Sequence, residues 1–467
     1  MLRVLDRGSR LCDGLTRREW LRIGSIGLGG LTLSALTAGR AAAAAQGIGG
    51  GSFGRAKSVI LFGLIGGPCQ LDTWDPKPDA PVEIRGEFGS IATRTPGLRC
   101  GELMPRTAAL TDKLAVLRAM VTGDNAHSSS GYQMLTGVPH IPPSVENAPP
   151  KAPNNMPSVG GIVRALRPGR GQLPAAITLP RSLSNVGNFP WPGQDAGVLG
   201  QQYNPWLIEA DPSEPNFRVP ALKLPQELAP LRFDERRTLL EQMNGHLADL
   251  ARAVNVENYD QQATKAIDLL SSSKTRSAFD LSQESDATRD RYGRGRFAQS
   301  VLLARRLVEA GVSLIQVNWT AIDGHPNKGS WDTHETHNQS AKSLLMPMMD
   351  QTFSALILDL EQRGLLAETL VVWLGEFGRT PKFNAKAGRD HWGSCFSLAA
   401  AGGGIRGGQV VGSSDHQAAH PTSGRTTPAD LWATVFHCLG YTPETVVHDT
   451  QNRPLPLSRG RVIEAIV

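Results

Sequence analysis

Apolar and polar positions along the chain follow two alternating patterns, one with the spacing of strands and one with that of helices. Four short runs are rich in apolar and β-branched residues: 57–65, 114–120, 312–318 and 369–374. Such runs are typical of strands buried on both faces of a sheet. Apolar residues recur at helical spacing in four longer stretches: 226–255, 296–310, 340–360 and 428–439. Because a helix that leads into a buried strand is the repeating unit of a parallel sheet, the pattern predicts an α/β fold with a mostly parallel central sheet flanked by helices.

The segment 139–225 interrupts this alternation and is dense in Pro, Gly and Asn. Proline cannot donate to a strand ladder, so we expect the segment to stay outside the central sheet. A short helix is predicted over 159–166 and a strand over 175–179. We interpret the segment as an insertion that passes over the ends of the central strands.

Polar residues follow each predicted strand at its carboxyl end. In chain order these are Asp72, the serine-rich turn that starts at His127, the segment 332–337, and Glu376. Ligands bind outside the carboxyl ends of strands in open α/β sheets, so these residues are expected to meet. Taken singly, Asp72 has an alternative as a turn former and the serines an alternative as a helix N-cap. Neighbouring Cys69 is expected to be a small buried residue, with a reactive thiol as the alternative.

The segment 325–337 holds the densest group of metal-ligand side chains, with three histidines and Asp332 inside thirteen positions. Neutral imidazole and carboxylate suit Zn, Mn or Fe, so His334, His337 and Asp332 are candidate ligands. The alternative is a helix start, in which Asp332 and Glu335 form a capping box. Downstream, Glu376 is followed by Arg379 and Arg389, either of which could pair with an anionic substrate, and by the pair Asp390 and His391.

Composition places the chain among ordinary globular proteins. It has 467 residues, 40 % hydrophobic and 19 % charged, which is room for one large domain over 57–467. Of the net charge of +5, about four belong to residues 1–45, which hold seven Arg against three acidic residues. The remainder is nearly neutral, which argues against a nucleic-acid-binding protein.

The first 45 residues have the pattern of an export signal. Arg17 and Arg18 precede a moderately apolar run, 23–38, and the small residues 41–45 offer cleavage sites. The run is shorter than the roughly 20 residues that span a bilayer and contains several glycines, although an uncleaved anchor remains the alternative. A Gly-rich linker is predicted over 46–56. We expect no membrane association after cleavage.

Three short motifs resemble a known family. They are WDTH at 331–334, GEFGRTP at 375–381 and GRDHWG at 388–393, and behind a twin-arginine leader they resemble the DUF1501 family of exported bacterial proteins. More widely, the order of strand-end residues resembles the alkaline-phosphatase-like superfamily of phosphatases, sulfatases and metal-dependent phosphomutases. The resemblance covers roughly residues 57–445 and implies a three-layer sandwich.

The resemblance also implies roles for residues. His127 stands at the modified cysteine of the sulfatase motif that ends in Thr136 and Gly137, which leaves Ser128 or Ser129 as nucleophile. The implied catalytic residues are His127, Ser128, Ser129 and Arg379. The implied metal ligands, which would have to converge, are Asp72, Asp332, His334, His337, Glu376, Asp390 and His391. Because Phe377 stands where the resemblance would have a further histidine, it implies one divalent ion or a remodelled pair, with Zn, Mn, Ca or Fe as the metal.

The function implied is a metal-dependent hydrolase of sulfate or phosphate esters. It would be exported in the folded state by the twin-arginine machinery to the periplasm or the medium. Its substrate would be a sulfated or phosphorylated small molecule or polysaccharide. The alternative is a non-catalytic exported binding protein on the same fold with a degenerate metal site.

Overall fold

The computed structural model describes residues 51–467 apart from 168, 170–172, 186 and 220–272. The predicted export signal and the predicted helix over 226–255 lie outside these described residues. No helix in the described part is both long and apolar enough to cross a membrane.

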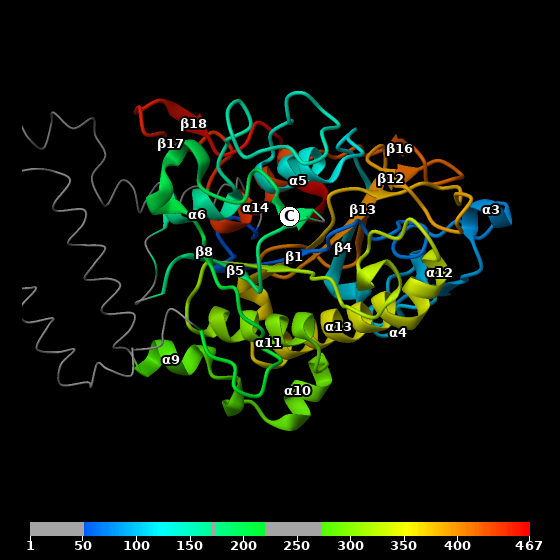
Figure 1. The fold of residues 1–467 in the computed structure, drawn as a ribbon, viewed down its shortest axis with the longest axis horizontal. Helices are drawn as coiled ribbons and strands as arrows, with labels where there is room; N and C mark the ends of the chain where they lie inside the picture. Colours follow the sequence, from blue (N-terminus) through cyan, green and yellow to red (C-terminus); the bar gives the residue numbers. More distant parts are fainter. Residues whose placement is uncertain (1–50, 168, 170–172, 186, 220–272) are drawn as a thin grey trace, which may run out of the picture. The chain divides into compact units, whose positions relative to one another are not determined.

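The described residues form an eight-stranded central sheet (Figure 1). Its order is β14 (Gln409–Val411), β4 (Leu114–Met120), β13 (Phe396–Ala401), β10 (Thr369–Leu374), β1 (Ser58–Gly63), β9 (Leu314–Asn318), β5 (Ala176–Leu179) and β8 (Trp206–Leu207). Strand β13 is antiparallel to both of its neighbours, and the other pairings in the sheet are parallel. The predicted mostly parallel sheet is confirmed.

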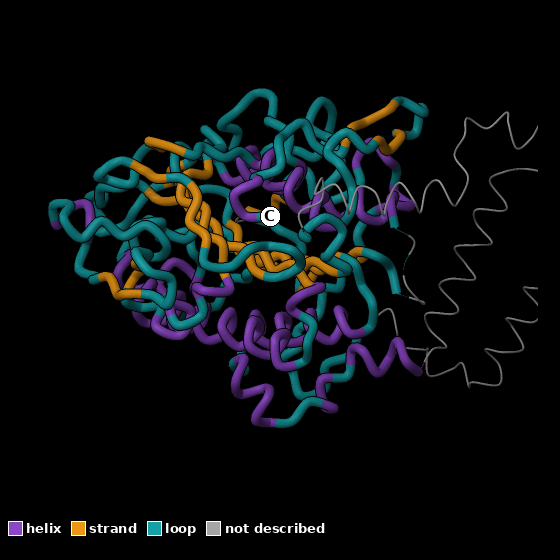
Figure 2. Tube along the Cα trace, turned by 180° about the vertical axis from the view of Figure 1, so that it is seen from behind, coloured by secondary structure: helices purple, strands orange, loops and turns teal. Residues whose placement is uncertain are grey.

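Helices cover both faces of the sheet (Figures 1 and 2). Alternate residues of β1 point to opposite faces, since side chains along a strand alternate. Ile60 and Phe62 pack with α11 (Arg296–Glu309) and α13 (Met346–Gln362). Val59 and Leu61 pack with α6 (Val159–Leu166) and α14 (Pro428–Leu439). The result is the predicted three-layer arrangement, with one apolar core on each side of the sheet.

Helix α14 shows why these residues form a helix. Thr427 and Asp430 make a reciprocal capping box, Pro428 occupies the first turn, and Gly440 ends the helix in the left-handed conformation. The helix predicted over 340–360 starts earlier than expected. Helix α12 (His337–Ser340) continues through a π-helical turn, Ala341–Leu345, into α13. Residue Thr336, at φ 45°, precedes α12, so the alternative of a capping box at Asp332 and Glu335 is wrong.

The prediction that 139–225 stays outside the central sheet is wrong for two strands. Strand β5 pairs in parallel with β9, and β8 pairs in parallel with β5. Pro174 and Pro180 flank β5 rather than interrupt it, so the N–H groups of its four residues remain available to the ladder. The short helix predicted in the same segment is confirmed as α6.

The remaining elements are short. The helices are α3 (Val82–Arg85), α4 (Pro105–Ala108), α5 (His127–Thr136), α9 (Ser273–Phe279) and α10 (Asp286–Tyr292). The two-stranded pairs are β2 (Ser90–Ala92) with β3 (Arg99–Gly101), β6 (Ser184–Asn185) with β7 (Phe189–Pro190), β11 (Gly378–Arg379) with β12 (His391–Trp392), β15 (Ser413–Ser414) with β16 (Pro421–Ser423), and β17 (Val446–His448) with β18 (Pro454–Pro456).

The topology brings five connections to one edge of the sheet. Strands β1, β4, β9 and β10 run in the same direction, so the segments that follow them leave at the same edge. Strand β13 runs in the opposite direction, and the segment that precedes it therefore enters at this edge. The residues after four strands and before a fifth are thus placed together.

Candidate metal centre

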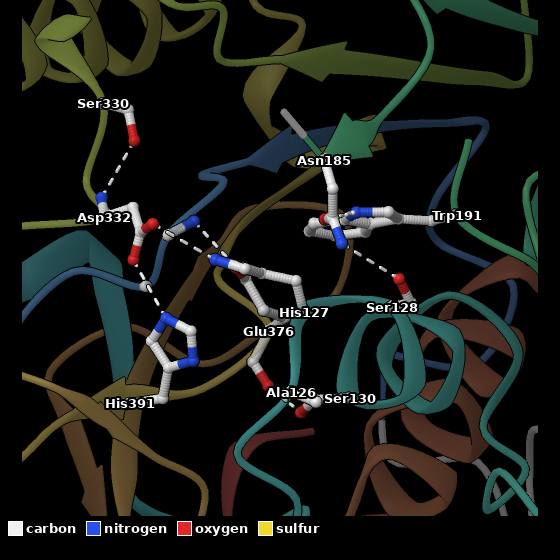
Figure 3. A network of polar contacts seen from close by, with 12 residues as sticks. Ala126, His127, Ser128, Ser130, Asn185, Trp191, Ser330, Asp332, Glu376 and His391 are labelled. Carbon is white, nitrogen blue, oxygen red and sulfur yellow. Dashed lines mark hydrogen bonds and ion pairs between the residues drawn. The ribbon is translucent and has the colours of Figure 1, made fainter. Parts of the chain in front are cut away.

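His127 is the first residue of α5, directly after the connection from β4. Its Nδ1 lies 2.8 Å from Glu376 Oε1, and its Nε2 lies 3.3 Å from Asp332 Oδ2 (Figure 3). The ring packs against the indole of Trp191, with centroids 5.8 Å apart. These contacts leave the His127 side chain 13 % exposed and fix the direction of its Nε2.

His391 and His334 reach the same carboxylate from the connections before β13 and after β9. His391 Nδ1 donates to the carbonyl oxygen of Asn125 at 2.6 Å, and His334 Nδ1 donates to Asp390 Oδ1 at 2.7 Å. Their Nε2 atoms lie 2.9 and 3.0 Å from Asp332 Oδ1. The two Nε2 atoms are 2.9 Å from each other.

The three imidazoles share one arrangement. Each places its Nδ1 against an oxygen that can only accept when the carboxylates are ionised, so Nδ1 carries a proton, and Nε2 can offer a lone pair to an ion once it has given up its own proton. All three Nε2 atoms turn toward Asp332. Ligand atoms of His127, Asp332 and His391 lie within 4.8 Å of one another.

This donor set fits a divalent metal ion. Metal-ligating histidines almost always donate their other nitrogen to a carboxylate or a backbone carbonyl, as all three rings do here. The facing Nε2 atoms of His334 and His391 are two acceptors that repel unless a proton or a cation lies between them. Three imidazoles and one carboxylate suit Zn, Mn or Fe better than Ca, which prefers oxygen ligands.

Charge is concentrated on Asp332. Burial would raise the pKa of its carboxyl, but hydrogen bonds with the three histidines and the charge of Arg379 hold that pKa well below its usual range. Burial would lower the pKa of His127, yet its hydrogen bonds with Asp332 and Glu376 raise it to about 10. Burial lowers the pKa of His391 despite its bond to Asp332. The centre therefore contains a permanently ionised carboxylate.

Arg379, predicted to clamp a substrate anion, is fully buried. It donates to the carbonyl oxygens of Gly66, Gly67 and Arg389, and at 2.6 Å to Asp332 Oδ1. Four of its five N–H groups therefore have protein acceptors. No pair of them is free for bidentate contact with a substrate, and the side chain instead positions Asp332.

Two predicted ligands lie behind the histidines. Glu376 is 3 % exposed, and its Oε1 accepts from the backbone N–H of Gly66 at 2.7 Å as well as from His127. Asp390 holds His334 in the same way from the more exposed side of the centre. Both carboxylates therefore orient imidazoles through Nδ1.

Two further predicted ligands belong to a separate buried group. His337 Nε2 lies 2.7 Å from Asp72 Oδ2, and ligand atoms of these two residues and of Cys69 are within 4.8 Å of one another. The structure thus divides the predicted ligands between two groups. The expected convergence of Asp72 and His337 with Asp332 on one ion does not occur.

A family model described as "Protein of unknown function (DUF1501)" matches residues 56–467. The chain belongs to the DUF1501 family. Among curated proteins, none matches the sequence.

Solved structures that are similar to the chain include a sulfatase and two phosphonate monoester hydrolases. The PsFucS1 sulfatase from Pseudoalteromonas sp. has 14 % identity and a TM-score of 0.41, over 87 % of this chain and 70 % of that one. The phosphonate monoester hydrolase SpPMH from Silicibacter pomeroyi has 12 % identity and a TM-score of 0.40, over 87 % and 76 %. The phosphonate monoester hydrolase of Agrobacterium radiobacter has 13 % identity and a TM-score of 0.35, over the same shares. Similarity this low carries no inference about activity, which has to come from the side chains.

The serines of α5 are not aimed at the centre. Ser128 lies beside Asn185, on the side of the helix away from Asp332 (Figure 3), and accepts from the Asn185 amide at 3.3 Å. Ser129 donates to Asp124 at 2.8 Å and accepts from the N–H of Val145. Both are fully buried, so the predicted nucleophiles Ser128 and Ser129 have no free hydroxyl facing Asp332.

Sequence reasoning missed two features of this centre. It places His127 among the catalytic residues but not among the candidate metal ligands, and it gives no role to Asn125 or Trp191. One signal was available, since His127 follows β4 at the same edge at which the other ligands leave their strands. The direction of an imidazole ring has no sequence signal.

Proposed function

We propose that this protein is a metal-dependent hydrolase of sulfate or phosphate esters, with one divalent ion held by His127, Asp332 and His391 and with neighbouring His334 as a further candidate ligand. The observation that supports it best is the common orientation of the three imidazoles, each with Nδ1 on an acceptor and Nε2 toward Asp332. When bound, such an ion lowers the pKa of a water molecule and neutralises the charge that grows on a phosphoryl or sulfuryl oxygen.

The chain's own residues favour direct attack by water over a covalent serine intermediate. The hydroxyl of Ser129 is bonded to Asp124, and that of Ser128 lies beside the Asn185 amide on the side of α5 away from Asp332 (Figure 3). An alcohol nucleophile needs a base within hydrogen-bond reach and a free approach to the substrate, and neither serine has both. We therefore assign the attack on the ester to water.

The substrate would approach from the side of His334 and Asp390, whose side chains are 40 % and 53 % exposed. On the opposite side, Glu376 and Trp191 bury His127 and exclude water from its Nδ1. A site open on one side suits a large substrate such as a sulfated or phosphorylated polysaccharide as well as a small ester.

A non-catalytic binding protein is the second candidate, and the bonded serines favour it. Phe377 adds to this case, because its ring stacks on His391 with centroids 4.2 Å apart and supplies no ligand. Such a protein would hold the ion and bind an anionic ligand without turnover.

In either case we propose export by the twin-arginine pathway to the periplasm or the medium, on the basis of Arg17 and Arg18 and the apolar run that follows them.

The decisive experiment combines metal analysis with turnover. Protein purified without chelator should contain about one equivalent of a transition metal, and His127→Ala should lose it. The wild type should hydrolyse aryl phosphate, phosphonate or sulfate esters, and the rate should fall on removal of the metal and return when it is added back. Metal binding without turnover of any of these esters would support the binding protein. Absence of metal from carefully prepared protein would refute both candidates.

A further inference from the structure

The buried group next to the metal centre forms a continuous hydrogen-bonded chain. His337 lies between Asp72, 2.7 Å from its Nε2, and the hydroxyl of Thr333, 2.6 Å from its Nδ1. None of the three residues is more than 4 % exposed. Thr333 is therefore linked to Asp72 through both nitrogens of one imidazole.

Thr333 also lies between two of the candidate metal ligands. Asp332 and His334 are its neighbours in sequence, and their side chains reach the metal centre while the Thr333 hydroxyl is held by His337. Its carbonyl oxygen accepts from the backbone N–H of Arg389 at 3.0 Å. A fixed Thr333 therefore fixes the directions of both neighbours.

The surroundings of Asp72 and His337 do not suit a second cation. Burial would raise the pKa of Asp72, but the hydrogen bond and charge of His337 lower it. The positive charge of the buried Arg389 guanidinium lowers it further. Burial and the nearby Asp72 raise the pKa of the Cys69 thiol, which disfavours the thiolate that a metal would need. The group also offers three protein ligands, whereas a closed structural zinc site takes four.

We propose that Asp72, His337 and Thr333 are positioning residues that hold the 332–334 segment in the geometry required at the metal centre. The inference rests on the proposed metal site and adds to it a prediction of one ion per chain. It reassigns Asp72 and His337, which the family resemblance implies are metal ligands. Orienting partners behind the ligands typically contribute a factor of about 10 to 100 in metal affinity.

A set of three threonine variants tests this role. Thr333→Val keeps the shape and removes the hydroxyl, Thr333→Ser keeps the hydroxyl, and Thr352→Val is the matched control. Thr352 is likewise fully buried, and its hydroxyl donates to the carbonyl oxygen of Tyr292 at 3.0 Å within the helical layer of α13. By competition with a chelator, Thr333→Val should bind cobalt(II) about 10 to 100 times more weakly than the wild type. Its visible cobalt spectrum should also shift, whereas Thr333→Ser and Thr352→Val should keep both properties.

Asp72→Asn separates positioning from ligation. If Asp72 is a positioning residue, the wild type holds one equivalent of metal and Asp72→Asn still holds one, with lower affinity. Two equivalents in the wild type and one in Asp72→Asn would overturn the proposal in favour of a second metal site. An unchanged cobalt affinity in Thr333→Val would overturn it as well.

Hydrogen exchange in metal-free protein makes the test independent of the proposed function. Amides of the 332–334 segment should exchange at least about tenfold faster in Thr333→Val than in Thr352→Val, because the segment has lost its anchor. Equal exchange in the two variants would refute the positioning role even if the metal site stands. Absence of metal from the wild type would refute the metal site, and the exchange rates would still decide the role of Thr333.

Discussion

The replacement of Glu376 by Gln gives the sharpest test of how the centre is built. The carboxylate is 3 % exposed, and one of its oxygens accepts from Gly66 N at 2.7 Å and from His127 Nδ1 at 2.8 Å. The oxygen of a Gln side chain can accept both hydrogen bonds, so the substitution removes the negative charge behind His127 with little change of shape. A neutral acceptor makes His127 a weaker electron donor at Nε2.

The size of the effect follows from this position. A carboxylate that orients a ligating histidine is worth a factor of about 10 to 100 in metal affinity, or about 1.4 to 2.7 kcal/mol. Glu376→Ala should cost more, because it also leaves the buried N–H of Gly66 without its acceptor. We expect the free energy of unfolding of metal-free Glu376→Ala to fall by about 1 to 3 kcal/mol.

Dissociation constants from chelator competition at one pH, and denaturant unfolding of the metal-free proteins, measure the two effects separately. Asp350→Asn is the matched control, since Asp350 is a buried carboxylate that accepts from the N–H groups of Arg106 and Thr107 at 3.0 and 2.7 Å. It should lower stability and leave metal affinity unchanged. If Glu376→Gln bound metal as tightly as the wild type, or lost it altogether as expected of a direct ligand, the reasoning would be refuted.

Three further predictions concern other parts of the chain. His391→Ala should reduce metal content in atomic absorption to well below one equivalent, and full retention would remove this residue from the centre. Burial opposes ionisation of Glu284, but its hydrogen bonds with Arg305 and Arg306 lower its pKa. The ionised Glu284 therefore stabilises the fold above about pH 4.3, the pKa of an unfolded Glu, and this stabilisation is lost as the pH falls through the folded pKa. Glu284→Gln should therefore be less stable than the wild type by about 2 kcal/mol at pH 7, and denaturant titrations should show the difference vanish in acid; a constant difference would contradict this. Replacing Arg17 and Arg18 together by Lys should retain the protein in the cytoplasm on cell fractionation, and normal export would exclude the twin-arginine route.

The elements that sequence predicted best are those whose own residues decide their structure. The apolar run Thr369–Leu374 predicts β10 because both faces of this strand are buried, and the helical spacing of apolar residues over 428–439 predicts α14. Strand β5 joins the sheet against prediction. The prolines at 174 and 180 lie outside the strand and remove no N–H group from its ladder, whereas a proline inside a strand would. The proline content of 139–225 as a whole does not show which of its residues are free of proline and can pair in a strand.

The centre was predicted in part. Asp332, His334 and His391 follow from residue type and from their place at strand ends, because the ends of parallel strands meet at one edge. Residue type and strand-end position do not show that His127, rather than His337, turns its imidazole toward Asp332. Which histidine turns its Nε2 toward Asp332 depends on the partner of its other ring nitrogen, the carboxylate of Glu376 for His127 and the hydroxyl of Thr333 for His337. Glu376 is 249 residues from His127 in sequence, and Thr333 is only 4 residues from His337, so neither partner follows from a common spacing.

The long connections that meet at the edge of the sheet also set the order of assembly. His127 and Glu376 are 249 residues apart in sequence, and His391 and Asn125 are 266 apart. Contacts of such sequence separation form late, because closing long loops costs entropy before the contact can stabilise anything. In a zinc finger the ion nucleates a local fold, whereas the candidate ligand atoms here come from the connections after β4 and β9 and before β13, which lie together only in the assembled sheet. Uptake of metal would then be the last step of maturation, and a metal-loaded chain would be one whose folding is complete.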